Sequence, residues 1–236
     1  MRLREASYAD LEAITWVLLA SFPNDPQWPY RFQWALVYPS EHRKHTRQRL
    51  SEYLDDSIKG VNKILVIEAP SNEDARIRKV IAFATYKLPG HLRKLPPKDN
   101  FTRLDANPSR QKAFRRASQE AALMLYDKYG EQQLKLVQLA THPDYWRRGA
   151  ATKLVQWGME RARTEHLGIT MLASPMGSSL YSKLGFTSCG TVTMHVPGEE
   201  EQLEYTAMNW GGEKTMEKEG KGRESTCSEG LSRCSG

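Results

Sequence analysis

The chain has 236 residues, a length that fits one domain, with or without appendages, better than two full domains. Hydrophobic residues make up 39% of the chain and charged residues 26%, which provides enough apolar material for a core and excludes wholesale disorder. The formal charge is +6, and nine basic but only two acidic residues lie between Lys87 and Arg116. We interpret this stretch as a solvated basic loop rather than a nucleic-acid surface.

The sequence shows no sign of export. No run of residues approaches the roughly 18 apolar residues of a membrane span, and the first residues do not resemble a secretory leader. The cysteines are Cys189, Cys227 and Cys234, an odd number with two close to the C-terminus, which does not resemble a disulfide framework. We therefore expect a soluble, cytoplasmic protein without a membrane partner.

The first half of the chain alternates between helix and strand patterns. Ser7 and Asp10 form a capping signature ahead of apolar residues at helical spacing. Prolines then interrupt an aromatic-rich stretch, and two later segments are rich in β-branched residues. These patterns predict a strand at 2–5, a helix at 8–20, an aromatic loop with short helical pieces at 22–32 and a polar helix at 40–55. An antiparallel strand pair is expected at 63–68 and 80–87.

The second half begins with a proline-rich loop at 89–108, which is long enough to suggest a functional role. A helical pattern through Phe114 and Leu125 ends at Gly130. The following segments predict a strand at 134–141, a helix at 149–167 and a strand at 169–174. A short helix at 178–184 and two strands at 187–196 and 203–210 follow. The result is a mixed α/β domain over residues 1–210, and the polar tail, residues 211–236, is expected to be disordered.

The most informative segment is a strand followed by a basic turn that opens into a helix. Gly149, Ala150 and Ala151 are small enough for a phosphate to approach the backbone, where the first turn of a helix leaves N–H donors unpaired. The spacing matches neither the dinucleotide-binding Gly-x-Gly-x-x-Gly pattern nor a P-loop. Taken alone, such a segment is more often a plain helix start with surface arginines.

A second motif changes that interpretation. About 25 residues after Gly149 stands Ser174-Pro-Met-Gly-Ser-Ser-Leu-Tyr-Ser-Lys-Leu-Gly-Phe186, and together the two motifs resemble the GCN5-related N-acetyltransferase (GNAT) superfamily. The family pattern is Gln/Arg-x-x-Gly-x-Gly/Ala after a strand, with Leu-Tyr-x-Lys-Leu-Gly-Phe one strand later. The resemblance covers about residues 1–210, and Phe22-Pro-x-Asp-Pro-x-Trp28 is similar to stand-alone fungal members. It implies a central mixed sheet of six to seven strands flanked by helices.

The resemblance also implies which residues bind acetyl-CoA. The strand backbone that pairs with the pantetheine arm corresponds to Leu139, Ala140 and Thr141. The loop around the pyrophosphate corresponds to Arg147, Arg148, Gly149, Ala150, Ala151 and Thr152, and Ser174 belongs to the same site. Two departures stand out: Trp146 replaces the usual Gln or Arg, and Ser174 and Gly177 replace the frequent Asn and Ala. We therefore expect Arg147 and Arg148 to hold the phosphates.

Tyr181 corresponds to the tyrosine beside the thioester sulfur. An amine that attacks a thioester must lose a proton, and the departing thiolate benefits from a proton donor. A tyrosine, with an ordinary pKa of about 10, is protonated at neutral pH and suits that role. Without the motif, Tyr181 would be interpreted as a core residue beside Phe186. The family's usual base positions fall on Lys135 and Val137, neither of them a plausible base, so the general base is unassigned.

Other candidates are weaker. His42 and His45 lie three residues apart, but without a third ligand a solvated helix face is favoured over a metal site. His142 is either a base or a surface residue, and Glu68 and Asp144 are possible bases that act through water. The aromatic side chains of the first loop either line an acceptor pocket or pack the first helix onto the sheet: Trp28, Tyr30, Phe32 and Trp34.

These motifs predict an acetyl-CoA-dependent N-acetyltransferase that uses no metal. The acceptor is expected to be a small-molecule amine that attacks directly in a ternary complex, since no cysteine is placed for a covalent intermediate. The alternative is a noncatalytic acyl-CoA-binding module, which the unassigned base would explain. We expect no nucleic-acid partner and a monomer or homodimer.

Overall fold

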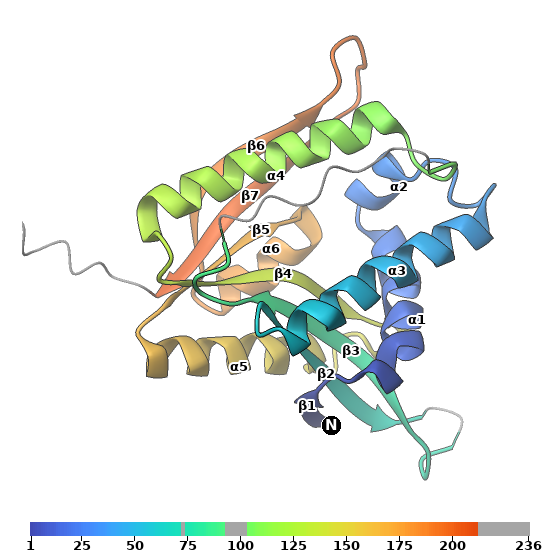
Figure 1. The fold of residues 1–236 in the computed structure, drawn as a ribbon, viewed down its shortest axis with the longest axis vertical. Helices are drawn as coiled ribbons and strands as arrows, with labels where there is room; N and C mark the ends of the chain where they lie inside the picture. Colours follow the sequence, from blue (N-terminus) through green and yellow to red (C-terminus); the bar gives the residue numbers. More distant parts are fainter. Residues whose placement is uncertain (72–73, 93–102, 212–236) are drawn as a thin grey trace, which may run out of the picture.

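The computed structural model describes residues 1–71, 74–92 and 103–211. A seven-stranded sheet with the order β1-β2-β3-β4-β5-β7-β6 forms its centre (Figure 1). Neighbouring strands are antiparallel, except for the parallel pair β4 and β5. The strands are β1 Arg2–Glu5, β2 Asn62–Pro70, β3 Arg78–Lys87, β4 Gln133–Thr141, β5 Gly168–Ala173, β6 Thr187–His195 and β7 Gln202–Gly211. The expected mixed sheet is thus confirmed.

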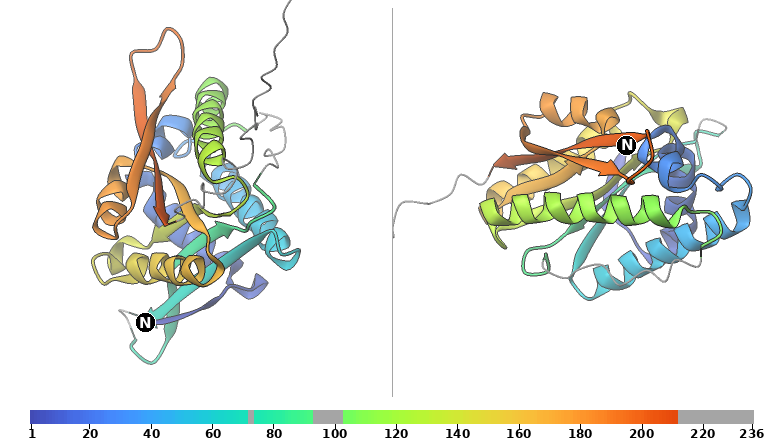
Figure 2. Two further views of the ribbon diagram at one scale, coloured as in Figure 1. Left: turned by 90° about the vertical axis from the view of Figure 1, so that its left-hand side faces the viewer. Right: turned by 90° about the horizontal axis from the view of Figure 1, so that it is seen from above.

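Helices cover both faces of this sheet (Figures 1 and 2). Alternate residues of β2 point to opposite faces, so Ile64 packs with α1 and α3, whereas Leu65 packs with α5 and α6. Helix α4 lies on the same face as α3 and packs against β6 and β7. The helices are α1 Leu11–Ser21, α2 Gln27–Arg31, α3 Pro39–Ile58, α4 Pro108–Tyr129, α5 Ala150–Glu165 and α6 Pro175–Lys183.

Two helices begin earlier than the sequence pattern predicted. Helix α4 starts at Pro108 rather than near Phe114, and α6 starts at Pro175 rather than Ser178. In each case a polar side chain caps the helix just before the proline, because Asn107 accepts from the N–H of Arg110 and Ser174 from that of Gly177. A proline fits the first helical position, where its missing N–H would have no partner.

The strand pair β4 and β5 separates along its length. The two strands pair only from Gln133 opposite Gly168 to Leu136 opposite Met171. Beyond this point β4 continues to Thr141 without a β5 partner, although it remains paired with β3 on its other side. The register between β3 and β4 shifts at Val137, where a bulge bends β4. The sheet therefore opens between its two central strands.

Some expectations concern parts of the chain that the structure does not describe. Residues 212–236 of the predicted tail, with Cys227 and Cys234, and residues 93–102 of the basic loop lie outside the described residues. Cys189 is a free thiol whose Sγ donates to Asn209. Across the described ranges, no helix is long enough and apolar enough to cross a membrane.

Candidate active site

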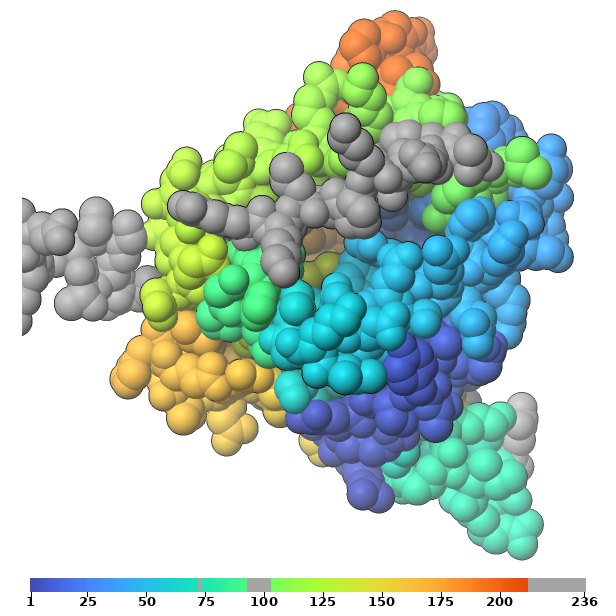
Figure 3. Space-filling view, viewed as in Figure 1, coloured from blue at the N-terminus to red at the C-terminus, as the bar shows by residue number. Residues whose placement is uncertain are grey.

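A cleft of about 2160 Å³ passes through the sheet where β4 and β5 separate. On one face it opens between α3 and α4, where the space-filling surface is hollowed (Figure 3). On the other face it reaches the start of α5 and the helix α6. Ordinary ligand pockets enclose about 300–1,000 Å³, so this cleft has room for more than one small molecule.

Most of the residues expected to bind acetyl-CoA line this cleft, together with Tyr181. They are Leu139, Thr141, Arg147, Gly149, Ala150, Ala151, Thr152 and Ser174. Ala140 does not, because its side chain is buried in the core beside α1. The side chain of Arg148 is turned to its own loop, where Nη2 donates to the carbonyl of Asp144 at 2.8 Å. Of the two arginines, Arg147 is therefore the one placed at the cleft.

The turn before α5 has a backbone suited to an anion. Arg147 and Gly149 adopt positive φ angles of 60° and 83°, which bring the chain around into the first turn of α5. No side chain caps this helix, and its first turn carries no acidic residue. The first N–H groups of a helix and the positive end of its dipole favour negative charge. The end of the cleft at α5 thus fits a phosphate group.

Unpartnered polar atoms gather along the cleft. In the described part of the chain, four buried side-chain polar atoms have no hydrogen bond, and three of them belong to cleft residues: Gln27 Oε1, Thr46 Oγ1 and Thr141 Oγ1. Buried polar atoms in folded proteins are almost always hydrogen-bonded. The carbonyl of Thr141, unlike its hydroxyl, accepts a hydrogen bond from the indole Nε1 of Trp146 at 2.6 Å. The remaining atoms fit a polar ligand.

Tyr181 lies on α6 with its ring packed against Phe186, at a centroid distance of 5.7 Å. Its hydroxyl makes no hydrogen bond to any described residue and borders the cleft. Burial raises the pKa of Tyr181, and the negative charge of Asp25 raises it further. A Cβ on Gly177 would come 3.0 Å from Cε2 of Tyr181, which explains why glycine stands where alanine is frequent. The ring of Tyr181 is therefore held by packing, and its raised pKa keeps the hydroxyl protonated at neutral pH.

Asp25 is a cleft residue that the sequence analysis missed. It lies between α1 and α2, and its Oδ1 accepts hydrogen bonds from the hydroxyl of Tyr205 and the N–H of Gln27. Its Oδ2 has no hydrogen bond within the described ranges, and no lysine or arginine of these ranges forms an ion pair with it. The motif Phe22-Pro-x-Asp-Pro contains this residue, but only the structure places the carboxylate near Tyr181.

Lys135 also lines the cleft, at the end where β4 and β5 are still paired. Burial lowers the pKa of Lys135 to about 8, with a smaller contribution from the charge of Lys87. A lysine with this pKa is partly neutral just above pH 7. Burial thus makes Lys135 a better base than the sequence analysis expected.

The weaker candidate bases lie elsewhere. His142 stacks on Trp16 with a ring distance of 3.8 Å and does not line the cleft. Glu68 is bound by Arg4 at 2.7 Å near the edge of the sheet, and Asp144 is exposed. His142, Glu68 and Asp144 are therefore not among the residues that line the cleft with Tyr181.

The expected solvated face was wrong for His42. This side chain is buried, with Nδ1 at 2.6 Å from Asp105 and Nε2 at 3.1 Å from the indole nitrogen of Trp28. Because an indole only donates, Nε2 accepts and Nδ1 carries the proton toward Asp105. Trp28 and Phe32 line the cleft and also pack in the core, whereas Trp34 is exposed.

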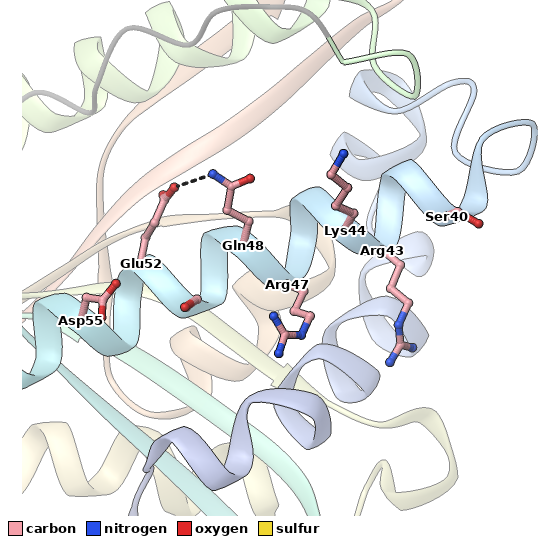
Figure 4. Close-up of a pocket in the computed structure, with 8 residues that line it drawn as sticks. Ser40, Arg43, Lys44, Arg47, Gln48, Glu52 and Asp55 are labelled. Carbon is pink, nitrogen blue, oxygen red and sulfur yellow. Dashed lines mark hydrogen bonds between the residues drawn. The ribbon is translucent and has the colours of Figure 1, made fainter.

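In the part of the chain that the structure describes, the outer surface of α3 and the metal-ligating side chains offer no second site. The described residues contain no group of three or more His, Cys, Asp or Glu side chains that could hold a metal ion. A shallow hollow on the outward side of α3 is lined by exposed residues of this one helix (Figure 4). Gln48 and Glu52 are hydrogen-bonded there, and Arg43 and Arg47 are paired with Glu12 of α1. This hollow has the features of a solvated helix face.

A family model matches part of the sequence that lines the cleft. The model, described as an acetyltransferase (GNAT) domain, matches residues 111–188, which include β4, the turn before α5, α5, β5 and α6. Over these residues the chain matches a GNAT acetyltransferase domain. It is therefore an acyltransferase, as the two motifs predicted. A search of curated protein sequences finds no match to this chain.

Solved structures share the GNAT fold over most of the chain. A histone acetyltransferase HPA2 and related acetyltransferase from Corynebacterium glutamicum is 18% identical, with a TM-score of 0.53 over 88% of this chain and 93% of that one. A ribosomal-protein-alanine N-acetyltransferase from Brucella melitensis is 15% identical, with a TM-score of 0.50 over 89% and 99%. At these identities the likeness shows a shared fold only. It does not show that this chain uses the same acceptors as those proteins.

Proposed function

We propose that this GNAT protein transfers an acetyl group from acetyl-CoA to the amine of a small molecule by direct attack in a ternary complex. The observation that carries the proposal is the cleft itself, which crosses the sheet at residues 137–141 of β4, where the strand lacks a β5 partner. The turn before α5 offers an anion site at one end of the cleft, and Tyr181 and Asp25 line the cleft as well.

The residues of the cleft divide the proton transfers between them. Asp25 Oδ2 is open to accept the proton that the amine loses as the new N–C bond forms. Tyr181 is held in its protonated form and donates to the sulfur as the C–S bond breaks. The amide and the free thiol are the products, so the reaction balances without a redox partner. Asp25 thus fills the role of base that the sequence left open.

The alternative, a noncatalytic acyl-CoA-binding module, makes a different prediction. The enzyme should release free thiol from acetyl-CoA only when an acceptor amine is added. A noncatalytic module should bind acetyl-CoA in isothermal titration yet release no thiol with any amine. The expected cytoplasmic location and monomeric or homodimeric state stay predictions.

The role of Asp25 is tested by replacing it with asparagine, which keeps its size and removes its basicity. We expect Asp25→Asn to lower kcat by about 10²- to 10⁴-fold while the acetyl-CoA dissociation constant stays unchanged. The matched control is Asp55→Asn on the outward side of α3, which should keep wild-type kcat. Full activity of a folded Asp25→Asn protein would remove Asp25 from the mechanism.

A further inference from the structure

Arg31 is a cation without a counterion at the acceptor side of the cleft. It stands at the end of α2, and its Nε donates to the backbone carbonyl of Gln27 at 3.3 Å. In residues 1–71, 74–92 and 103–211, no carboxylate lies within ion-pair distance of its guanidinium. Its side chain lines the cleft. The other arginine nearby, Arg103, is bound to Asp105 at 2.6 Å.

Aromatic rings rather than polar groups surround this guanidinium. Its Cζ lies 3.7 Å from the ring centre of Phe114, 4.9 Å from that of Phe32 and 5.5 Å from that of Trp28. Burial lowers the pKa of Arg31 to about 9, and a group with this pKa is still charged at pH 7. The side chain keeps part of its exposure to solvent, and a partly buried charge is costly when no group of opposite charge lies close to it. No described carboxylate lies within ion-pair distance of Arg31, and the charge of Asp25 acts on it only from further away.

Acceptor groups for an amine stand one turn away from Arg31. Gln27 is 7% exposed, and its Oε1 has no hydrogen bond in the described ranges. The Oδ2 atom of Asp25 is also open, and the charge of Asp25 acts on Arg31 without forming an ion pair with it. The segment from Asp25 to Arg31 therefore presents two hydrogen-bond acceptors and one cation to the same space.

We propose that the acceptor carries an anionic group, a carboxylate or a phosphate, close to its amine, and that Arg31 binds this group while Asp25 and Gln27 receive the amine. This inference rests on the proposed function of the same cleft. A planar guanidinium can bind either anion through two parallel hydrogen bonds. Arg31 then selects the substrate, whereas Asp25 and Tyr181 carry out the proton transfers.

The test compares acceptors that differ only in the anionic group. Amino acids are assayed beside their decarboxylated amines, and phosphoethanolamine beside ethanolamine, with thiol release as the readout. Wild-type protein should prefer the anionic member of a pair, and Arg31→Gln should lower kcat/KM for it by about 10- to 100-fold. The neutral member should change little in the same variant, so a folding defect is distinguished from lost recognition. The two series show whether the anion is a carboxylate or a phosphate.

Binding and stability measurements keep the test independent of turnover. In a thermal-shift assay without acetyl-CoA, anionic amines should stabilise wild-type protein more than their neutral partners, and Arg31→Gln should abolish this difference. Arg31→Met should melt at least as high as wild type, because it removes an unpaired charge and keeps an apolar stem. Arg43→Gln on the outer face of α3 is the control and should keep the preference for anionic amines.

Three results would overturn this inference. They are equal use or equal binding of both members of every pair by wild type, a preference that survives in Arg31→Gln, and a lower melting temperature for Arg31→Met. A failure of the proposed function looks different, because thiol release would then be absent with every amine while the binding comparison still decides the role of Arg31.

Discussion

At the scale of single residues, the proposed donor role of Tyr181 can be separated from its packing, since phenylalanine keeps its ring and removes only the hydroxyl. We expect Tyr181→Phe to lower kcat by about 10²-fold and to change the free energy of unfolding by about 1 kcal/mol or less. The ring contact with Phe186 is kept, and the hydroxyl has no bond in the described chain to lose. Turnover with a saturating acceptor and urea denaturation measure the two effects.

The matched control for this substitution is Tyr129→Phe. Tyr129 is a buried tyrosine of α4 that packs in the core and does not line the cleft. Its replacement should leave kcat at the wild-type value. If Tyr181→Phe also turned over at the wild-type rate while chemistry limits the reaction, the donor role of Tyr181 would be wrong.

Lys135 makes a pH-dependent contribution to stability. Its pKa is about 8 in the folded protein and about 10.5 when unfolded, so the unfolded chain binds more protons between these values. The full cost of the buried charge is present below pH 8, declines as pH rises from 8 to 10.5, and is absent above. Lys135→Met should therefore raise the free energy of unfolding by about 1 to 3 kcal/mol at pH 7.

Denaturation with urea at pH 7 and pH 10 measures this effect. The advantage of Lys135→Met over wild type should be clearly smaller at pH 10. Lys59→Met, at the exposed end of α3, should show no such change between the two pH values. An advantage that is independent of pH would mean that packing, not charge, causes it.

Sequence reasoning reached some site residues and not others for a physical reason. Tyr181 and the turn at Gly149 belong to contiguous motifs, so their spacing along the chain carries the signal. Asp25 was missed because its proposed role depends on proximity to Tyr181 and Tyr205, which lie more than 150 residues away in the sequence. Arg31 stands out only because it is partly buried without an ion-pair partner among the described residues, and neither property can be read from a residue type.

At the scale of elements, Gly158 in α5 is a helical glycine that alanine is expected to destabilise rather than stabilise. Replacing a glycine in a helix by alanine usually stabilises it by about 1 kcal/mol. Here the added Cβ would lie 2.6 Å from the hydroxyl of Tyr86, which is fully buried and donates to the carbonyl of Leu154. We expect Gly158→Ala to destabilise the protein by about 1 to 3 kcal/mol in urea denaturation.

A neighbouring position on the same helix provides the comparison. Gln156 is exposed on α5, and Gln156→Ala should change the free energy of unfolding by no more than about 0.5 kcal/mol. A stabilised Gly158→Ala protein would show that Tyr86 can move aside, and that the contact between α5 and β3 is loose.

The order of the elements was predictable, while some of their boundaries were not. Every strand of the sheet was expected, and those after β1 were recognised by residues that alternate or are apolar and β-branched over several positions. The starts of α4 and α6 were missed because capping depends on one side chain, Asn107 or Ser174, rather than on a period. The short helix α2 also lacks a full period, so it was expected only as helical pieces in a loop.

The pairing of strands could not be predicted from periodicity either. The pattern of β4 indicates a strand up to Thr141, yet the bulge at Val137 and the loss of β5 as a neighbour depend on contacts with other elements. The resemblance to the GNAT superfamily implied that the backbone there is available to a ligand. The structure also brings Asp25 and Arg31 to the lining of the cleft, which the sequence analysis did not expect.

At the scale of the whole molecule, the sheet consists of two parts, β1 to β4 and β5 to β7, that share only four paired positions at the β4–β5 junction. Amide hydrogens in a junction this short should exchange with solvent sooner than those in the longer β2–β3 ladder. A ligand that lies along residues 137–141 contacts both parts, so its binding energy adds to their cohesion. Saturation with acetyl-CoA should then slow deuterium uptake in β5 and β7 as well as in β4, and make the two parts unfold together in a single transition.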